Sequence, residues 1–215
     1  MKITSTYFLK NWQIMFFITA AIFTISRPME PYSFSWLVKI IPVLTLILFV
    51  FLTTTDLNRK RNTLLLIGLG CSLVGDFILD YDRQGGFVFG LAAFFVAHVF
   101  YIIRLGSWKP NLKGSLLGSA LLSYGGITCY LILPNLGDLL IPVIAYMVIL
   151  LTMSLSAVFS KQPSRWLVLG GFSFVISDSL IGIDKFYLSI NHSHIYIMIS
   201  YYLAQYCLVK GLTKT

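Results

Sequence analysis

The chain has 215 residues, of which 57% are hydrophobic and 11% are charged, and its formal net charge is +8. Soluble domains carry about 25% charged residues, so this composition excludes a soluble protein and requires a lipid bilayer to cover the apolar surface. The basic residues stand in short turns between apolar segments and form no continuous face, which argues against nucleic-acid binding.

Apolar segments follow one another along the whole chain, and each is long enough to cross a bilayer as a helix, which takes roughly 20 residues. They cover approximately residues 7–25, 34–53, 63–80, 87–105, 114–133, 138–159, 165–183 and 193–210. The connections between them are short and contain Pro, Gly and Asn, which interrupt helices. The sequence therefore predicts an all-α fold, a polytopic transmembrane helical bundle with eight transmembrane helices. It is expected to form a single integral membrane domain over residues 1–215.

The first apolar segment follows Lys2 and Lys10, as a secretory signal would. No small-residue cleavage site comes after it, so we expect a retained helix rather than a signal peptide.

Lysine and arginine residues are divided unevenly between the two sides that eight crossings define. One side carries Lys2, Lys10, Arg59, Lys60, Arg61, Arg104, Lys109, Lys113, Lys161, Arg165, Lys210 and Lys214. The other side carries only Arg27, Arg83 and Lys185, and Lys39 falls within a span. Cytoplasmic loops are enriched in basic residues, so both termini are predicted to be cytoplasmic. The expected location is the plasma (inner) membrane, crossed several times.

Two acidic residues stand inside apolar segments: Asp76 in "GCSLVGDFILDYD" and Asp178 in "FSFVISDSLIGID". The stretches 68–82 and 170–184 align without gaps and pair these two residues, which leaves open a parallel repeat of four helices or a chance match. Each aspartate lies about one to one and a half turns from the outer end of its helix, so we expect both at a similar depth. Lys39, which enters from the same side, is expected in the same layer.

A carboxylate within a membrane needs a partner or a function. Asp76 and Asp178 could form a structural ion pair with Lys39, or a catalytic pair. Two neighbouring carboxylates in a site of low dielectric constant do not both ionise readily, so one keeps a proton, and Lys39 would stabilise the ionised partner. Such a pair supplies an acid and a base without a serine nucleophile or a metal. Alternatively, Lys39 extends to the lipid headgroups.

Further polar side chains are candidates to support this site or to bind a substrate. They are His98, which lies deeper, and Tyr146, Ser177, Tyr201, Tyr202 and Gln205. The alternative for the tyrosines is an interfacial position, and for His98 a hydrogen-bonded packing role. Ser177 has no histidine close in sequence that would activate it.

The remaining acidic and histidine residues near the outer ends are expected to be solvent-facing or in loops. Asp80, Asp82 and Asp184 are expected to face water, and His192 and His194 to lie in a loop. Two histidines at i, i+2 with no third ligand nearby are a weak metal signal. We therefore predict no metal site and no cofactor.

The residues "LVGDFILDYD", "AHVFY", "FSFVISD" and "YYLAQYCLVKG", in this order, resemble the YhhN-like family, which includes lysoplasmalogenases. The resemblance runs from about residue 34 to 211. "KIIP" resembles that family's Lys-Pro element, with two residues inserted between Lys39 and Pro42.

The resemblance implies a membrane hydrolase that cleaves the vinyl ether bond of a lysoplasmalogen. The products would be a fatty aldehyde and glycerophosphoethanolamine or glycerophosphocholine, with Asp76 and Asp178 as the catalytic residues. The implied partners are the lysophospholipid substrate and membrane lipid.

A proton-coupled transporter for a small molecule or lipid is the alternative, since intramembrane Asp, His and Lys residues suit it as well. A membrane scaffold protein would leave the buried charges unexplained. The sequence leaves open the headgroup preference, which aspartate is the acid, and the oligomeric state.

Overall fold

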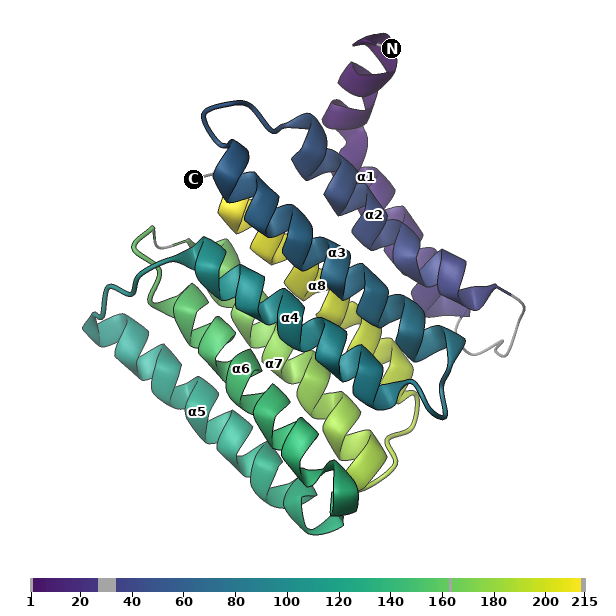
Figure 1. The fold of residues 1–215 in the computed structure, drawn as a ribbon, viewed down its shortest axis with the longest axis vertical. Coiled ribbons are helices and arrows are strands. Elements are labelled where there is room, and N and C mark those ends of the chain that lie inside the picture. Colours follow the sequence, from purple (N-terminus) through teal and green to yellow (C-terminus); the bar gives the residue numbers. More distant parts are fainter. Residues whose placement is uncertain (1, 27–33, 163, 214–215) are drawn as a thin grey trace. The chain divides into compact units, whose positions relative to one another are not determined.

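A computed structural model describes residues 2–26, 34–162 and 164–213. The predicted turn at Arg27–Pro31 and the basic residue Lys214 lie outside the described residues. Within the described ranges the chain forms long α-helices and two short 3₁₀ turns, and no strand. The helices are α1 (Lys2–Ser26), α2 (Ser35–Leu52), α3 (Arg59–Tyr81), α4 (Phe87–Leu105), α5 (Leu112–Ile132), α6 (Leu140–Val158), α7 (Arg165–Phe186) and α8 (Ser193–Thr213) (Figure 1).

The all-α fold is confirmed, and each predicted segment corresponds to one helix. In the described ranges seven helices, α1 to α7, are long and apolar enough to cross a membrane. Helix α8 is not among them, because it carries polar residues such as His194, Gln205 and Lys210. Helix α3 begins at Arg59, four residues before the predicted apolar segment, because a helix can continue past the hydrocarbon into the polar layer. The protein is an integral, multi-pass membrane protein.

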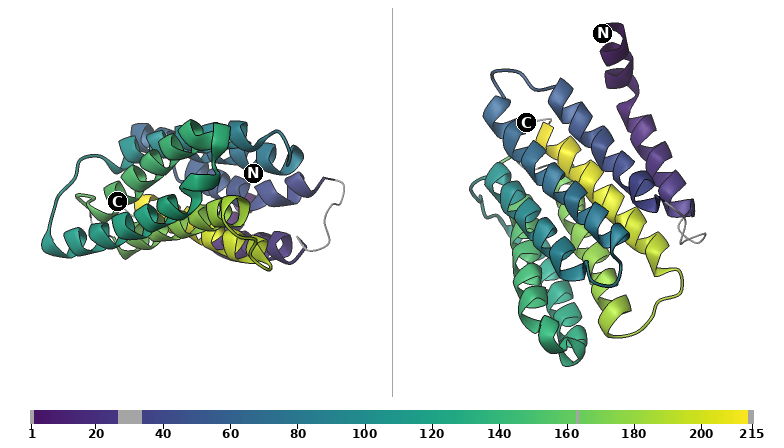
Figure 2. Two further views of the ribbon diagram at one scale, coloured as in Figure 1. Left: turned by 90° about the horizontal axis from the view of Figure 1, so that it is seen from below. Right: turned by 45° about the vertical axis from the view of Figure 1, so that its right-hand side comes forward.

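The helices pack into two compact units, residues 1–100 and 101–215, and the boundary falls within α4. In the first unit α2 packs against both α1 and α3, and Trp12 of α1 stacks on Phe49 of α2 with ring centroids 4.0 Å apart. In the second unit α7 packs along α8 and also contacts α5 and α6 (Figures 1 and 2). The single membrane domain over residues 1–215 stays a prediction.

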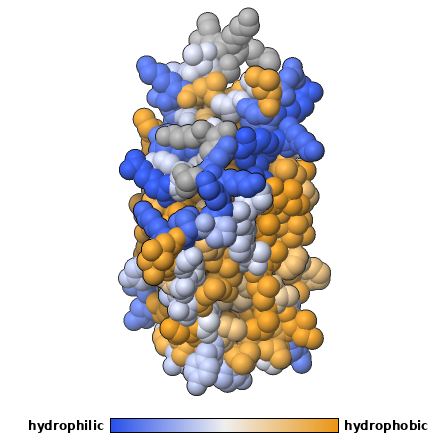
Figure 3. Space-filling model, turned by 90° about the vertical axis from the view of Figure 1, so that its left-hand side faces the viewer, coloured by the Kyte–Doolittle hydropathy of each residue, from blue (hydrophilic) through white to orange (hydrophobic). Residues whose placement is uncertain are grey.

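Large apolar side chains are exposed on most of the helices. Examples are Ile14, Phe17 and Ile18 of α1, Leu116, Ile127 and Tyr130 of α5, and Ile141 and Val148 of α6. Figure 3 shows broad apolar patches on one face. Contiguous apolar surface of this extent is typical of contact with lipid, whereas soluble monomers expose little of it.

Asp184 organises the connection between α7 and α8. Its Oδ1 accepts a hydrogen bond from the backbone N–H of Ile190 at 2.7 Å, and its Oδ2 accepts one from the Ser193 hydroxyl at 3.0 Å. Asp184 is half-buried and does not simply face water. The following His194 lies in the first turn of α8, so its predicted place in a loop is wrong.

The orientation predicted from the basic residues can be tested at two exposed loop positions. Gln84 lies between α3 and α4, on the predicted outer side, and Ser107 lies between α4 and α5, on the predicted cytoplasmic side. After removal of the native cysteines, we expect Gln84→Cys in intact cells to react with a membrane-impermeant thiol reagent. Ser107→Cys should react only after permeabilisation. The reverse pattern would refute cytoplasmic termini.

Candidate functional site

A buried ion pair joins α2 and α3. The Lys39 ammonium nitrogen lies 3.5 Å from Oδ1 of Asp76, and the two side chains are only 10% and 3% exposed. The alternative in which Lys39 extends to the lipid headgroups is therefore wrong. A charge buried in this way requires its partner, because removing one member leaves the other uncompensated.

Proline and glycine residues shape the two helices beside this pair. Pro42 lies inside α2 and has no N–H to bond the carbonyl of Val38, next to Lys39. Gly75 precedes Asp76 on α3, and a Cβ built there would lie 2.6 Å from the Phe94 ring of α4. Glycine at position 75 therefore allows α4 to pack directly beside the buried carboxylate.

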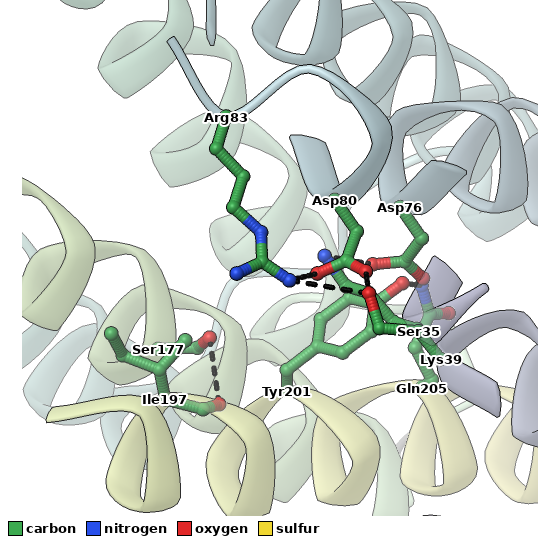
Figure 4. Close-up of polar contacts among 9 residues, drawn as sticks. All are labelled: Ser35, Lys39, Asp76, Asp80, Arg83, Ser177, Ile197, Tyr201 and Gln205. Carbon is green, nitrogen blue, oxygen red and sulfur yellow. Dashed lines mark hydrogen bonds and ion pairs between the residues drawn. The ribbon is translucent and has the colours of Figure 1, made fainter. Parts of the chain in front are cut away.

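A second polar cluster lies where α2 begins and α3 ends, on the side predicted to be the outer one, and we call Ser35, Asp80 and Arg83 the outer cluster (Figure 4). The Ser35 hydroxyl donates to Oδ2 of Asp80 at 2.5 Å. Nη2 of Arg83 donates to Oδ1 of Asp80 and to the Ser35 hydroxyl, both at 3.2 Å.

The expectation that Asp80 faces water is wrong, since its side chain is only 1% exposed. Asp80 follows Asp76 by one helical turn, and Ser35 precedes Lys39 by one turn, so both belong to the faces where α2 meets α3. The i, i+4 spacing was the sequence signal that could have identified Asp80. Its burial is offset by the Ser35 hydroxyl and the Arg83 guanidinium.

Asp178 has a different partner in the second unit. The Tyr146 hydroxyl of α6 donates to Oδ2 of Asp178 on α7. Tyr146 is buried, so an interfacial position for it is wrong, and Asp178 is half-buried. Two turns away the Ser154 hydroxyl donates to the Gly171 carbonyl oxygen at 3.1 Å, where a Cβ at Gly171 would lie 3.2 Å from the backbone of Ser154. This close approach sets α6 against α7.

Helix α8 carries a buried polar network. The Tyr101 hydroxyl donates to Oε1 of Gln205, and Nε2 of Gln205 donates to the Tyr201 hydroxyl, both at 3.1 Å. The rings of Tyr201 and Tyr202 are 5.4 Å apart, and both residues are buried. The interfacial alternative is therefore wrong for these two tyrosines. Tyr101 was not predicted as an individual site residue.

The other candidate serine and the candidate histidine are also buried. The Ser177 hydroxyl donates to the carbonyl oxygen of Ile197 at 3.2 Å and so links α7 to α8 (Figure 4). His98 on α4 is fully buried. In the part of the chain that the structure describes, no three His, Cys, Asp or Glu side chains are grouped so as to hold a metal ion.

The arrangement therefore offers two carboxylates in different surroundings. Asp76 is paired with an ammonium group in the first unit, and Asp178 accepts a bond from a neutral hydroxyl in the second. Their action as one catalytic pair stays a prediction. Buried carboxylates with distinct partners are suited to separate acid and base roles.

The model of the YhhN family matches residues 34–212, which include every candidate residue described above. The chain belongs to the YhhN family.

Curated relatives share this region. The chain is 34% identical to lysoplasmalogenase TMEM86B of Homo sapiens over 173 residues, covering 80% of this chain and 72% of that protein. It is 31% identical to lysoplasmalogenase TMEM86B of Sus scrofa, with 95% and 88% of the two chains covered. Identity to a lysoplasmalogenase of Mycobacterium bovis is 30%, with 72% and 62% covered. No solved structure matches this YhhN-family chain.

Two glycines of α3 provide a matched test of the packing around Asp76. Gly75→Ala places a methyl group against the Phe94 ring, whereas a Cβ at Gly70 meets no atom within 4 Å. We expect Gly75→Ala to destabilise the protein by about 1–3 kcal/mol through overpacking. Gly70→Ala should be neutral or slightly stabilising, because alanine favours helix. Thermal unfolding of the two variants in detergent measures the difference, and equal melting temperatures would contradict this interpretation.

Proposed function

We propose that this protein is a lysoplasmalogenase of the plasma membrane. Membership of the YhhN family, with curated relatives named lysoplasmalogenase, supports the reaction class. The observation that carries the mechanism is a carboxylate, Asp76, that is buried between apolar helices beside Lys39. An ionisable group in this position has a high free-energy cost, and its presence therefore indicates a function.

The proposed reaction is acid-catalysed hydrolysis of an enol ether. A proton adds to the alkenyl carbon that is not bonded to oxygen, and the remaining cation is an oxocarbenium ion. Water adds to that ion and loses a proton to give a hemiacetal, which collapses to a fatty aldehyde and the glycerophospho-alcohol. The reaction needs a proton donor, together with an anion that stabilises the cation and orients the water.

The different partners of the two aspartates suggest how these roles are divided. Asp76 forms an ion pair with Lys39, so we assign it as the carboxylate that stabilises the oxocarbenium ion. Asp178 accepts a bond from the neutral Tyr146 hydroxyl, which stabilises an ionised carboxylate less than an ammonium group does, so of the two we assign Asp178 as the proton donor. This assignment requires the two carboxyl groups to reach the same substrate.

The substrate is a lipid with one chain whose ether oxygen is attached directly to glycerol. A site near the outer end of α3 places that bond close to headgroup depth and leaves the chain among apolar side chains. We assign His98, Ser177, Tyr201, Tyr202 and Gln205 to supporting or substrate-binding roles. Access would be from the outer leaflet, given the predicted orientation.

Purified protein in detergent should release fatty aldehyde from a lysoplasmalogen, whereas a transporter would not. We expect Asp76→Asn and Asp178→Asn each to lower the rate by about 10²-fold or more, because loss of a general acid or base typically costs 10²–10⁴-fold. Asp82→Asn, an exposed position just beyond α3, is the matched control and should retain activity. Near-normal turnover in either of the first two variants, with native folding, would contradict the pair.

Lys39 should be essential as a compact ammonium group. Lys39→Met leaves Asp76 without its cation and should lower aldehyde release, and Lys39→Arg should restore it only in part, because a guanidinium is planar and larger. Lys60→Met, an exposed position at the start of α3, is the control. Activity in Lys39→Met equal to that of the control would remove Lys39 from the proposed site.

A further inference from the structure

We propose that Arg83, held in place by Asp80 and Ser35, binds the phosphate of the lysolipid headgroup. This inference rests on the proposed function and assigns the part of the substrate that the catalytic residues do not contact. The chemistry recognised is a phosphodiester anion.

The contacts of Arg83 are those of an oriented arginine. Its Nη2 bonds both Oδ1 of Asp80 and the Ser35 hydroxyl at 3.2 Å, which fixes the plane of the guanidinium. Asp80 is almost completely buried, while the Arg83 side chain is 35% exposed, so the arginine is anchored by a buried group and remains partly open to solvent. Figure 4 shows the guanidinium meeting Asp80 and Ser35 through one terminal nitrogen. A guanidinium held in this way presents a planar fork that suits phosphate oxygens.

The spacing between the two polar layers suits a glycerophospholipid. Asp80 lies four residues beyond Asp76 on α3, and Ser35 lies four residues before Lys39 on α2. Four residues of helix correspond to about 6 Å along the axis. In a lysoplasmalogen the vinyl ether and the phosphate are separated by the three carbons of glycerol, a similar length. A substrate with its ether bond at Asp76 would therefore place its phosphate at the level of the outer cluster.

The arginine at position 59 offers a useful contrast. Arg59 and Asp56 have the same i, i+3 spacing and a 2.6 Å contact, but their side chains are 73% and 88% exposed. A pair like that contributes little and orients nothing. Arg83 differs because its acidic partner is buried and bonded from a second helix, and because it is one of few basic residues on the predicted outer side. The buried Asp80 therefore holds Arg83 in one position, which the exposed Asp56 cannot do for Arg59.

The test compares two substrates with the same alkenyl chain, an alkenyl-glycerophosphoethanolamine and the alkenylglycerol that lacks the phosphate. Full-length wild type, Arg83→Gln and the control Arg59→Gln are assayed in detergent micelles. Hydrogen bonds to charged groups are strong enough that we expect Arg83→Gln to raise KM for the phosphate-bearing substrate by about 10- to 100-fold. Its kcat for that substrate, and both constants for alkenylglycerol, should change little. Arg59→Gln should match wild type on both substrates.

Two further variants distinguish a loss of phosphate binding from a loss of folding. Arg83→Lys keeps the charge and should recover part of the affinity. Asp80→Asn, a change at a positioning residue, should raise KM for the phosphate-bearing substrate alone. Equal loss of kcat on both substrates in Arg83→Gln would show a structural role and overturn the proposal, as would unchanged kinetics on both.

The phosphate could belong to the substrate or to a bilayer phospholipid. If the cluster holds a resident phospholipid, Arg83→Gln will change the kinetic constants for both substrates equally, and the change will depend on added phospholipid. That result would overturn the proposal.

Binding is also measured without turnover, as the rise in melting temperature on addition of glycerophosphoethanolamine. We expect this rise in wild type and Arg59→Gln but not in Arg83→Gln. If wild type releases no aldehyde, the proposed function fails. The phosphate site is then tested by the melting temperatures alone, and it fails as well if Arg83→Gln shows the same rise as wild type.

Discussion

The burial of Asp76 is the constraint on which the first unit depends. A carboxylate surrounded by apolar helices is tolerated only with a compensating charge, and Lys39 of the neighbouring helix provides it at 3.5 Å. Because each partner is fixed on a rigid helix, the ion pair also fixes the register of α2 against α3. That register brings Ser35 to Asp80 one turn further out. The catalytic candidate and the outer cluster are thus two consequences of one helix pairing.

In the second unit a helical aspartate again has a partner on the preceding helix, but the partner is a different chemical group. The aligned stretches 68–82 and 170–184 lie in α3 with its C-cap residue and in α7, and in each unit the preceding helix supplies a partner to the aspartate. That partner is an ammonium for Asp76 and a phenol hydroxyl for Asp178. A symmetrical pair of environments would give two equivalent carboxyl groups. The two carboxyl groups therefore stand in different environments, which is the arrangement that the proposed division into an acid and a base requires.

Hydropathy predicted the helices well because spanning a bilayer sets both their length and their composition. It failed for Asp80, because position along a helix gives depth and not the direction in which a side chain points. Partners distant in sequence were also beyond reach: Tyr101 and Gln205 are separated by 104 residues. The distances of Lys39 and Asp76 from their helix ends predict that both lie at the same depth. The ion pair between them agrees with this prediction, because the connection between α2 and α3 is short and joins neighbouring helices. No such local argument relates Asp76 to Asp178.

Hydrolysis within a membrane protein has to combine a dry site with a supply of water. The vinyl ether must reach a protonated acid, which survives better away from bulk solvent, but the oxocarbenium ion must then meet one water molecule. In the proposed site, Asp76, the carboxylate assigned to stabilise that ion, is almost fully buried one turn below the end of α3, while Arg83, just beyond that helix end, is partly exposed. An anion bound at Arg83 would hold the headgroup at this boundary and leave the alkenyl chain in the apolar interior. Recognition of the headgroup and control of water access would then depend on the same few residues.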